Sequence, residues 1–289
     1  MPPLGLHTVI AKEVGDSLRH HVLVWNDEAE TTLVCCHGFL DQAWGFRDLA
    51  EALVRGGLRV VAFDWRGHGQ TEHVGAGGYY HFPDYVLDLH DLMPLLASGP
   101  VHLFGHSMGG SAAAMYAATH PGVARTLTLV EGLGPPDYGG EPPDKLRGWL
   151  DSMDRARRRG THPMEDLADA VTRLRTQNRD LPADLAYFLA EKGTVEVEQG
   201  RQWTFDPLHR TTTPAIFSAE TFATFLRRIE VPTLVVGGAR GYRTADHAQR
   251  VAQLPNAREI TIDDVGHMVH WLKPEALAHV VLAHVGSAR

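Results

Sequence analysis

The chain has 289 residues, which can bury a large core and fit one large domain or one domain with a sizeable insertion. A composition of 44% hydrophobic and 21% charged residues excludes a disordered or fibrous chain. The formal net charge of -8 gives no broad positive field, so we expect neither nucleic acid nor an anionic membrane as a partner.

The cysteines and the N-terminus bear on the cellular compartment. Cys35 and Cys36 are adjacent in an apolar run, so they point to opposite faces of a strand, where a mutual disulfide would be strained. The sequence starts without a basic region followed by an apolar one, and no stretch approaches the ~20 apolar residues of a membrane span. We therefore expect two free thiols and a cytoplasmic protein, whose oligomeric state the sequence does not indicate.

The first half of the chain predicts a mainly parallel sheet. Two early runs, at 7–13 and 18–25, join through Gly15-Asp16 and predict an antiparallel hairpin at one sheet edge. Short apolar runs then alternate with helical patterns, as in a sheet covered by helices on both faces. The predicted strands are Thr31–Cys36, Arg59–Asp64, Val101–Phe104 and Leu127–Glu131. The predicted helices are Trp44–Arg55, Asp84–Leu96 and Met108–Thr119.

The pattern changes at Gly134, where Gly and Pro clusters open a charged and aromatic stretch of helical sequence without a strong strand before Val231. The sheet pattern then resumes, with predicted elements at 231–237, 244–254, 257–262 and 274–285. Residues 1–133 and 230–289 are therefore predicted to form the core domain, and 134–229 a helical cap. The basic run of the cap is interpreted as a solvated helix face without a chemical role; it consists of Arg155, Arg157, Arg158 and Arg159.

A nucleophile motif follows the strand that begins at Val101. The sequence Gly105-His106-Ser107-Met108-Gly109-Gly110 matches G-x-S-x-G between a strand and an Ala-rich helix, the context that this motif requires. A residue on so sharp a turn is strained, and the glycines on either side let strand and helix approach. Ser107 is then held at the positive end of the helix, and it is the predicted nucleophile.

An oxyanion hole is predicted from His37-Gly38-Phe39, which directly follows a strand. There the backbone N–H of Phe39 can face the same cleft as the N–H of Met108. His37 is expected to pack beneath this loop rather than to act as a base. The turn at 64–69, Asp-Trp-Arg-Gly-His-Gly, is expected to brace the neighbouring loops.

The predicted base is His267, in the loop between the last strand and the last helix, because the chain order nucleophile, acid, histidine places the base late in the sequence. His270 is a nearby competitor. Asp263 and Asp264 are too close in sequence to His267 to swing behind it easily.

Taken together, the chain resembles the α/β-hydrolase fold superfamily over essentially its full length. The resemblance is carried by His37-Gly38-Phe39-Leu40-Asp41, Gly67-His68-Gly69, the elbow around Ser107 and Gly266-His267. Lys192-Gly193-Thr194, Gly200 and Phe205-Asp206-Pro207 are similar to the cap of the serine hydrolase-like proteins, although that family more often has Arg-Asp in place of Phe205-Asp206. The resemblance implies a mostly parallel, doubly wound α/β sheet with a helical cap insertion.

The acid of the triad departs from the common pattern. Many relatives carry it as G-x-x-D after the strand at 231–237, where this chain reads Gly237-Gly238-Ala239-Arg240-Gly241. Some relatives place it after the strand that follows the nucleophile helix, which makes Glu131 the candidate, the alternative being a strand-end glutamate that faces solvent. Asp246, the nearest later carboxylate, is expected within a helix and pointing away from the cleft.

These residues predict a serine hydrolase that cleaves a small, apolar carboxylic ester or related acyl substrate. The elbow serine argues against epoxide hydrolases and haloalkane dehalogenases, which resemble this fold but use aspartate there. The reaction needs no metal or organic cofactor, and no cluster has metal-ligand spacing. Two alternatives stay open: a hydrolase of carbon–carbon bonds next to a carbonyl, and a non-catalytic binding protein. The sequence does not indicate the acyl length.

Overall fold

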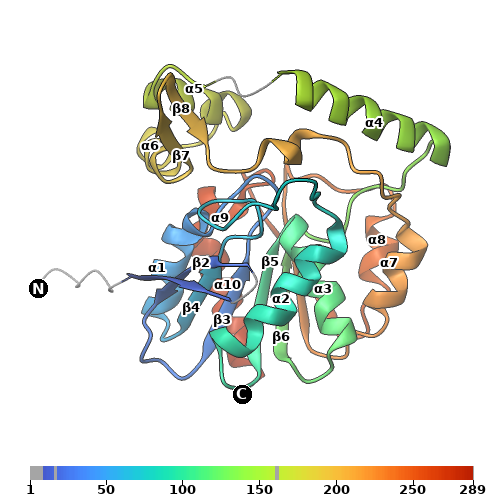
Figure 1. Cartoon of the computed structure of the whole chain (residues 1–289). Coiled ribbons are helices and arrows are strands. Elements are labelled where there is room, and N and C mark those ends of the chain that lie inside the picture. The colour runs from blue at the N-terminus through green and yellow to red at the C-terminus, as the bar shows by residue number, and fades with distance from the viewer. Residues whose placement is uncertain (1–8, 16–17, 160–162, 289) are drawn as a thin grey trace, which may run out of the picture.

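A computed structural model describes residues 9–15, 18–159 and 163–288 and contains an eight-stranded main sheet (Figure 1). The strand order is β1-β2-β4-β3-β5-β6-β9-β10, in which only the pairs that involve β2 are antiparallel. The strands are β1 (Val9–Val14), β2 (His20–Trp25), β3 (Thr32–Cys36), β4 (Arg59–Phe63), β5 (Val101–His106), β6 (Ala124–Val130), β9 (Thr233–Gly238) and β10 (Ala257–Ile262). The predicted parallel sheet with a hairpin at one edge is confirmed, although His7, Thr8 and Asp16 lie outside the described residues.

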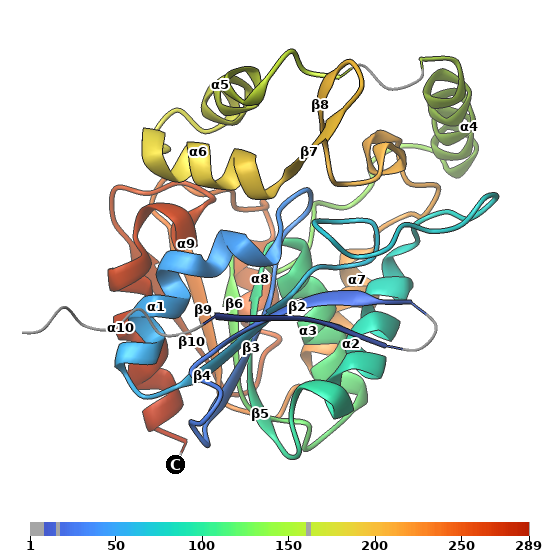
Figure 2. The same ribbon diagram turned by 60° about the vertical axis from the view of Figure 1, so that its left-hand side comes forward.

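Helices cover both faces of this sheet (Figure 2). One face carries η1 (Ala43–Phe46), α1 (Arg47–Arg55), α9 (Val269–Leu272) and α10 (Pro274–Gly286). The other carries α2 (Phe82–Leu96), α3 (Met108–Thr119) and α7 (Ala219–Leu226). The short helix α8 (His247–Val251) connects β9 and β10 and is shorter than predicted.

Strand β3 is buried on both faces, so helices must pack on both sides of the sheet. Cys35 belongs to the apolar cluster under α1 and α10, whereas Cys36 belongs to the cluster under α2 and α3. Both are fully buried and unbridged, as the alternation of side chains in a strand predicts. A strand buried on both faces reads as a continuous apolar run, and this is the pattern that identified it.

The segment between β6 and β9 lies largely above the carboxyl ends of the strands (Figures 1 and 2). It contains α4 (Pro142–Arg159), α5 (Leu167–Gln177), α6 (Ala183–Lys192), β7 (Thr194–Val197), β8 (Gly200–Trp203) and η2 (Pro207–Arg210) before α7. The antiparallel pair β7–β8 was not predicted, because strands of four residues are too short to show a period. Helix α7 lies at the side of the sheet rather than above it, since Phe222 and Leu226 pack in the core under α3.

Among the helices that the structure describes, none has both the length and the apolar character to cross a membrane.

Candidate active site

Ser107 forms the turn between β5 and α3, with φ 51° and ψ −119°. A positive φ is costly for a residue that carries a side chain, so it persists only where the surroundings hold it. The Ser107 amide donates to the carbonyl of Val130 at 2.9 Å, and its carbonyl accepts from the amide of Gly110 at 3.0 Å. Backbone hydrogen bonds on both sides therefore fix the strained serine at the carboxyl end of the sheet.

The glycines around Ser107 are required by close backbone contacts. A Cβ atom on Gly105 would collide with the Cα of Gly110, and one on Gly109 would collide with the carbonyl of Cys36. Strand β5, helix α3 and strand β3 thus approach each other at a distance that only glycine permits. The predicted reason for the G-x-S-x-G spacing agrees with these contacts.

His267 and Glu131 are joined by a hydrogen bond between Nδ1 of the histidine and Oε2 of the glutamate, at 3.1 Å. The Glu131 side chain is 1% exposed, while the side chain of His267 is 41% exposed. Glu131 directly follows β6 and has a φ of 52°. The buried carboxylate thus lies behind the histidine, and the far side of the imidazole remains accessible.

The loop that lacks the expected aspartate instead surrounds the Glu131 carboxylate. The amide of Gly238 donates to Oε1 at 2.8 Å, and the amide of Tyr242 donates to Oε2 at 3.0 Å. A Cβ atom on Gly241 would collide with this carboxylate. Arg240, which stands where many relatives carry the acid, bonds Asp180 at 3.0 Å. The Glu131 carboxylate, which follows the neighbouring strand β6, therefore lies next to the loop that carries the acid in many relatives.

The competing side chains are engaged elsewhere. Asp246 precedes α8 rather than lying within it, which corrects the predicted helix start, and its carboxylate accepts from Nε of Arg250 at 2.7 Å. His270 is completely buried and bonds Asp41 at 3.1 Å. Neither Asp246 nor His270 hydrogen-bonds to His267 or Ser107 among the described residues.

One cavity of about 660 Å³ brings the predicted site residues together. It is lined by Ser107, His267, Glu131, Phe39 and Met108. The remaining wall is mostly apolar and comes from α2, α3, residues 134–136 and the segment that includes α7; it includes Phe82, Met115, Pro135, Ile216, Phe217, Phe222 and Phe225. Such a wall suits an apolar ligand portion next to a small polar centre.

The loop that follows β3 presents free backbone donors to this cavity. Within the part of the chain that the structure describes, neither the amide of Phe39 nor that of Met108 donates to a protein acceptor. Leu40 has a φ of 59°, and the amide of Asp41 bonds back to the carbonyl of Gly38 at 3.3 Å. This tight turn leaves the Phe39 amide available to a negatively charged oxygen.

His37 lies beneath this loop and is fully buried. Its Nε2 accepts the amide of Trp65 at 3.1 Å, so Nδ1 carries the proton and donates to the carbonyl of Gly38 at 2.7 Å. Asp64 braces the same region, because its carboxylate accepts from the amide of Ala43 at 2.6 Å. Both residues support the loop and neither lines the cavity, in agreement with the sequence interpretation.

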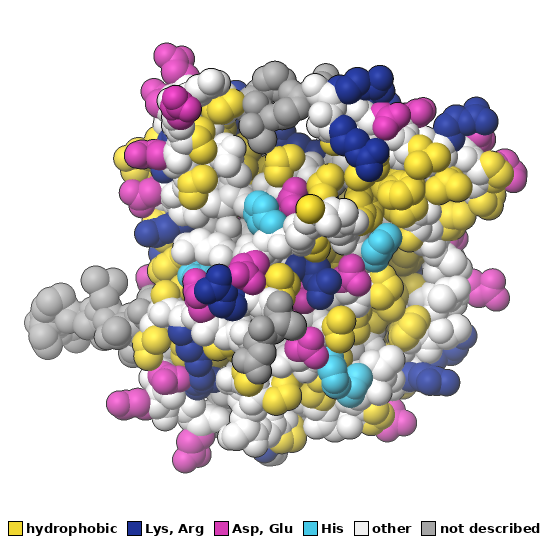
Figure 3. Space-filling view, viewed as in Figure 1, with side chains coloured by type: hydrophobic (Ala, Val, Ile, Leu, Met, Phe, Trp, Pro, Cys, Tyr) yellow, Lys and Arg dark blue, Asp and Glu magenta, His cyan; other side chains and the backbone are white. Residues whose placement is uncertain are grey.

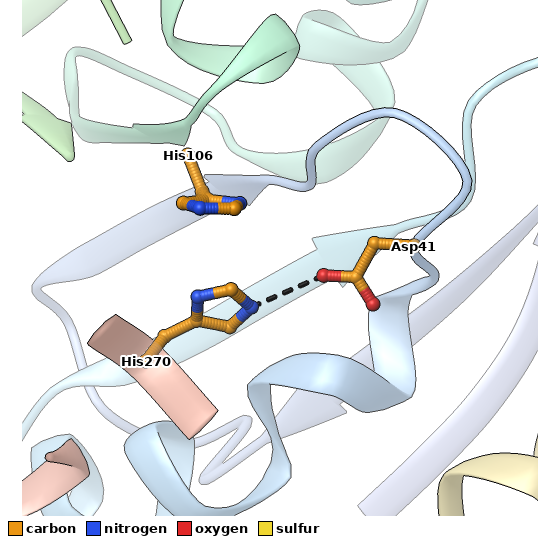
Figure 4. Close-up of side chains that lie close together, drawn as sticks. All are labelled: Asp41, His106 and His270. Carbon is orange, nitrogen blue, oxygen red and sulfur yellow. Dashed lines mark hydrogen bonds and ion pairs between the residues drawn. The ribbon is translucent and has the colours of Figure 1, made fainter. Parts of the chain in front are cut away.

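A buried cluster of Asp41, His106 and His270 lies behind the elbow, where sequence reasoning did not find it (Figure 4). His106 Nε2 donates to the backbone carbonyl of His267 at 2.9 Å. Burial lowers the pKa of His270 to about 3 and that of His106 well below its usual value, and it raises the pKa of Asp41 to about 7. The neutral imidazole of His106 therefore ties the elbow to the loop that carries His267.

The same three side chains are the group that could hold a metal ion among the described residues, since one ligand atom of each lies within 4.8 Å of the others. They come from the loop after β3, the end of β5 and helix α9, so no spacing in the sequence indicates them. Two features of the sequence could have drawn attention to this cluster: His106 directly precedes Ser107, and His270 lies three residues after His267. Direct hydrogen bonds engage one nitrogen of each imidazole, and the one from His106 supports the His267 loop.

Comparisons with known proteins extend this picture. The family model of the alpha/beta hydrolase fold matches residues 31–274. A serine hydrolase-like protein of Danio rerio is 26% identical over 272 residues, which cover 89% of this chain and 82% of that protein. The sn-1-specific diacylglycerol lipase ABHD11 of Mus musculus is 28% identical over 263 residues, covering 88% and 80%. The solved thioesterase domain from the curacin biosynthetic pathway superposes with a TM-score of 0.86 at 27% identity, covering 96% of this chain and 99% of that domain. The chain belongs to the α/β-hydrolase fold family, as its motifs predicted, and it resembles the serine hydrolase-like proteins within it.

Proposed function

We propose that this protein is a serine hydrolase that cleaves a small-molecule carboxylic ester or related acyl substrate through an acyl-enzyme. The observation that carries the proposal is the 3.1 Å hydrogen bond that Nδ1 of His267 donates to the buried carboxylate of Glu131, on the cavity that also holds the strained Ser107. A nucleophile, a base and an acid that orients the base form the set that acyl transfer requires.

In the first half of the reaction, Ser107 Oγ attacks the substrate carbonyl while His267 Nε2 accepts the hydroxyl proton. Nε2 makes no hydrogen bond among the described residues and is free for this task. The amides of Phe39 and Met108 stabilise the negative oxygen of the tetrahedral intermediate. The intermediate collapses as the carbon–oxygen or carbon–sulfur bond breaks, and His267 donates its proton to the leaving group.

In the second half, water attacks the acyl-enzyme ester. His267 takes a proton from this water, a second tetrahedral intermediate forms, and its collapse releases the carboxylic acid while the proton returns to Ser107. Glu131 acts throughout on the histidine: it holds the proton on Nδ1, keeps Nε2 directed at the reacting groups and stabilises the imidazolium.

The acyl portion of the substrate is the part that the apolar cavity wall suits. Phenylalanine, methionine and proline side chains make up much of the cavity wall around Ser107. The named activities of the relatives, a diacylglycerol lipase and a thioesterase, are both acyl cleavages, which supports an ester or thioester as the scissile bond.

Labelling with a fluorophosphonate tests the proposal, because this reagent needs an activated serine. We expect mass spectrometry to locate the label on Ser107, with Ser107→Ala unlabelled and unable to hydrolyse nitrophenyl butyrate. Ser111 lines the same cavity, and the Ser111→Ala variant should still be labelled. Undiminished ester hydrolysis by folded Ser107→Ala would refute the proposal.

A further inference from the structure

A second cavity, of about 470 Å³, is lined by residues of the cap segment together with His73 of the core domain. Three arginines from different elements line it: Arg155 of α4, Arg173 of α5 and Arg210 of η2. No aspartate or glutamate is part of its lining among the described residues. Lys and Arg side chains gather over this part of the cap (Figure 3), although the whole chain carries a net charge of -8. This local excess of positive charge runs against the overall composition.

The positive charge in this cavity is only partly compensated. Arg173 forms an ion pair with Asp169 at 2.9 Å. Neither Arg155 nor Arg210 has a carboxylate partner in the described part of the chain, and the Arg210 guanidinium lies 5.0 Å from the ring centre of Phe205. Partial desolvation lowers the pKa of Arg210, and the nearby charge of Arg173 lowers it further. An anion between these side chains would relieve this repulsion.

The sequence analysis interpreted the basic run on α4 as a solvated face. Arg157 and Arg158 agree with this, because both are exposed and each lies within 4.0 Å of a carboxylate oxygen of Asp154. Arg155 is also exposed, but it has no carboxylate partner among the described residues and it lines the second cavity. The sequence could not distinguish Arg155 from Arg157 and Arg158, because the other arginines that line this cavity come from η2 and α5.

The second cavity is adjacent to the candidate active site. Thr211 and Thr212 line it, whereas the next residue, Thr213, lines the cavity of Ser107. The ring of His209, two residues before Thr211, lies 5.9 Å from the ring of Phe39, whose amide is the predicted oxyanion donor. Arg210 directly follows His209, so the segment at 209–213 contacts the loop of Phe39 and lines both cavities.

We propose that the second cavity binds a phosphate group on the leaving-group side of the acyl substrate. Guanidinium groups match phosphate oxygens in geometry and charge, and a set of three suits a phosphate monoester or diester. The stacked rings of Trp203 and Phe205, 6.0 Å apart, supply an apolar wall for the rest of that group. The inference rests on the proposed function, because it assigns the acyl part to the first cavity and the phosphorylated part to the second.

Two kinds of substrate share this chemistry: acyl thioesters of a phosphorylated thiol carrier, and acyl esters of a phosphoglycerol. Kinetics with butyryl-coenzyme A and with dibutyryl phosphatidate distinguish them, each compared with a neutral butyrate ester, nitrophenyl butyrate. In Arg210→Gln, the kcat/KM ratio of the preferred phosphorylated substrate to the neutral ester should fall about tenfold. Arg157→Gln on the outer face of α4 is the matched control, and it should leave the ratio at the wild-type value.

A binding measurement makes the test independent of catalysis. The Ser107→Ala variant is titrated calorimetrically with coenzyme A and with glycerol 3-phosphate. The same titrations are then made with the double variant that carries both Ser107→Ala and Arg210→Gln. At least one probe should bind the single variant, with a Kd at least fivefold weaker in the double variant. The inference is overturned if neither probe binds Ser107→Ala more tightly than it binds the double variant. If no butyrate ester is hydrolysed, the proposed function fails, and the titrations still decide whether the arginine cavity binds phosphate.

Discussion

The carboxylate of Glu131 hydrogen-bonds Nδ1 of His267 at 3.1 Å, although the two residues are 136 positions apart in the chain. Glu131 directly follows one parallel strand and His267 lies in the loop after another, and the carboxyl ends of parallel strands meet at the same edge of the sheet. The loop after β9 completes the arrangement by donating two amides to the same carboxylate. The backbone of this loop thus holds the glutamate, while the carboxylate of Asp246 in the same loop is engaged by Arg250.

The role of the loop after β9 can be tested without mutating Ser107, His267 or Glu131. Gly241→Ala places a methyl group against the Glu131 carboxylate and should displace it from His267. We expect kcat for nitrophenyl butyrate to fall at least about tenfold, with a smaller change in KM, because a small misplacement of a catalytic group is costly. Gly148, which lies in α4 with open space around it, is the control. Equal kcat values for Gly241→Ala and Gly148→Ala would contradict the assigned role of the loop.

His106 should act as a positioning residue. His106→Phe keeps a ring but removes the hydrogen bond to the His267 carbonyl, so we expect kcat to fall about tenfold. His106→Gln retains an N–H donor and should recover much of the loss. Because a role in packing alone would favour phenylalanine over glutamine, a higher kcat for His106→Phe than for His106→Gln would rule out positioning through this hydrogen bond.

The buried His209 should make stability depend on pH. Burial lowers its pKa to about 4, whereas the unfolded chain titrates near the usual value of about 6.5. The unfolded state therefore binds more protons between these values, and the free energy of unfolding decreases as the pH falls, by roughly 3 kcal/mol for this group at pH 4 and below. Asp41, with a pKa of about 7, contributes in the opposite direction over this range.

The measurement is urea unfolding of wild type and His209→Phe from pH 7 to pH 4.5. Phenylalanine retains the ring contacts with Tyr80 and His68 but does not titrate. The decrease in the free energy of unfolding toward low pH should be smaller in the variant. The same substitution at the exposed His279 should leave the wild-type slope unchanged, and identical slopes for all three proteins would refute the prediction.

Phe225 should help to define acyl length. It lies on α7 and lines the cavity of Ser107, so Phe225→Ala would enlarge this cavity without altering the candidate triad. Across nitrophenyl esters of graded acyl length, the optimum of kcat/KM should move to longer chains. An unchanged optimum would show that the acyl chain does not reach α7.

The sequence predicted the parallel sheet, the elbow at Ser107 and the late histidine, because each of these is a local pattern. Strands show as apolar runs, and the G-x-S-x-G motif is contiguous in the sequence, even though the glycine at 109 is required by a contact with the distant Cys36. Glu131 was predicted from the missing aspartate after the strand at 231–237 and from the resemblance to relatives that carry the acid after the preceding strand. No local pattern indicates it, since its partners lie in the loop after β9 and in the loop after β10. The support from His106 and the arginine cavity of the cap escaped detection, because side chains from separate elements create both of them.

The decisive measurement is kcat of Glu131→Gln beside Asp246→Asn. The amide keeps the shape of Glu131 but loses the charge that orients His267 and stabilises its protonated form, so kcat should fall by roughly 10³ to 10⁴, by analogy with loss of the orienting carboxylate in serine proteases. Asp246 bonds Arg250 and should tolerate its change with near wild-type kcat. Wild-type turnover by folded Glu131→Gln, or a large loss in Asp246→Asn alone, would contradict the assignment of Ser107, His267 and Glu131 as a catalytic triad.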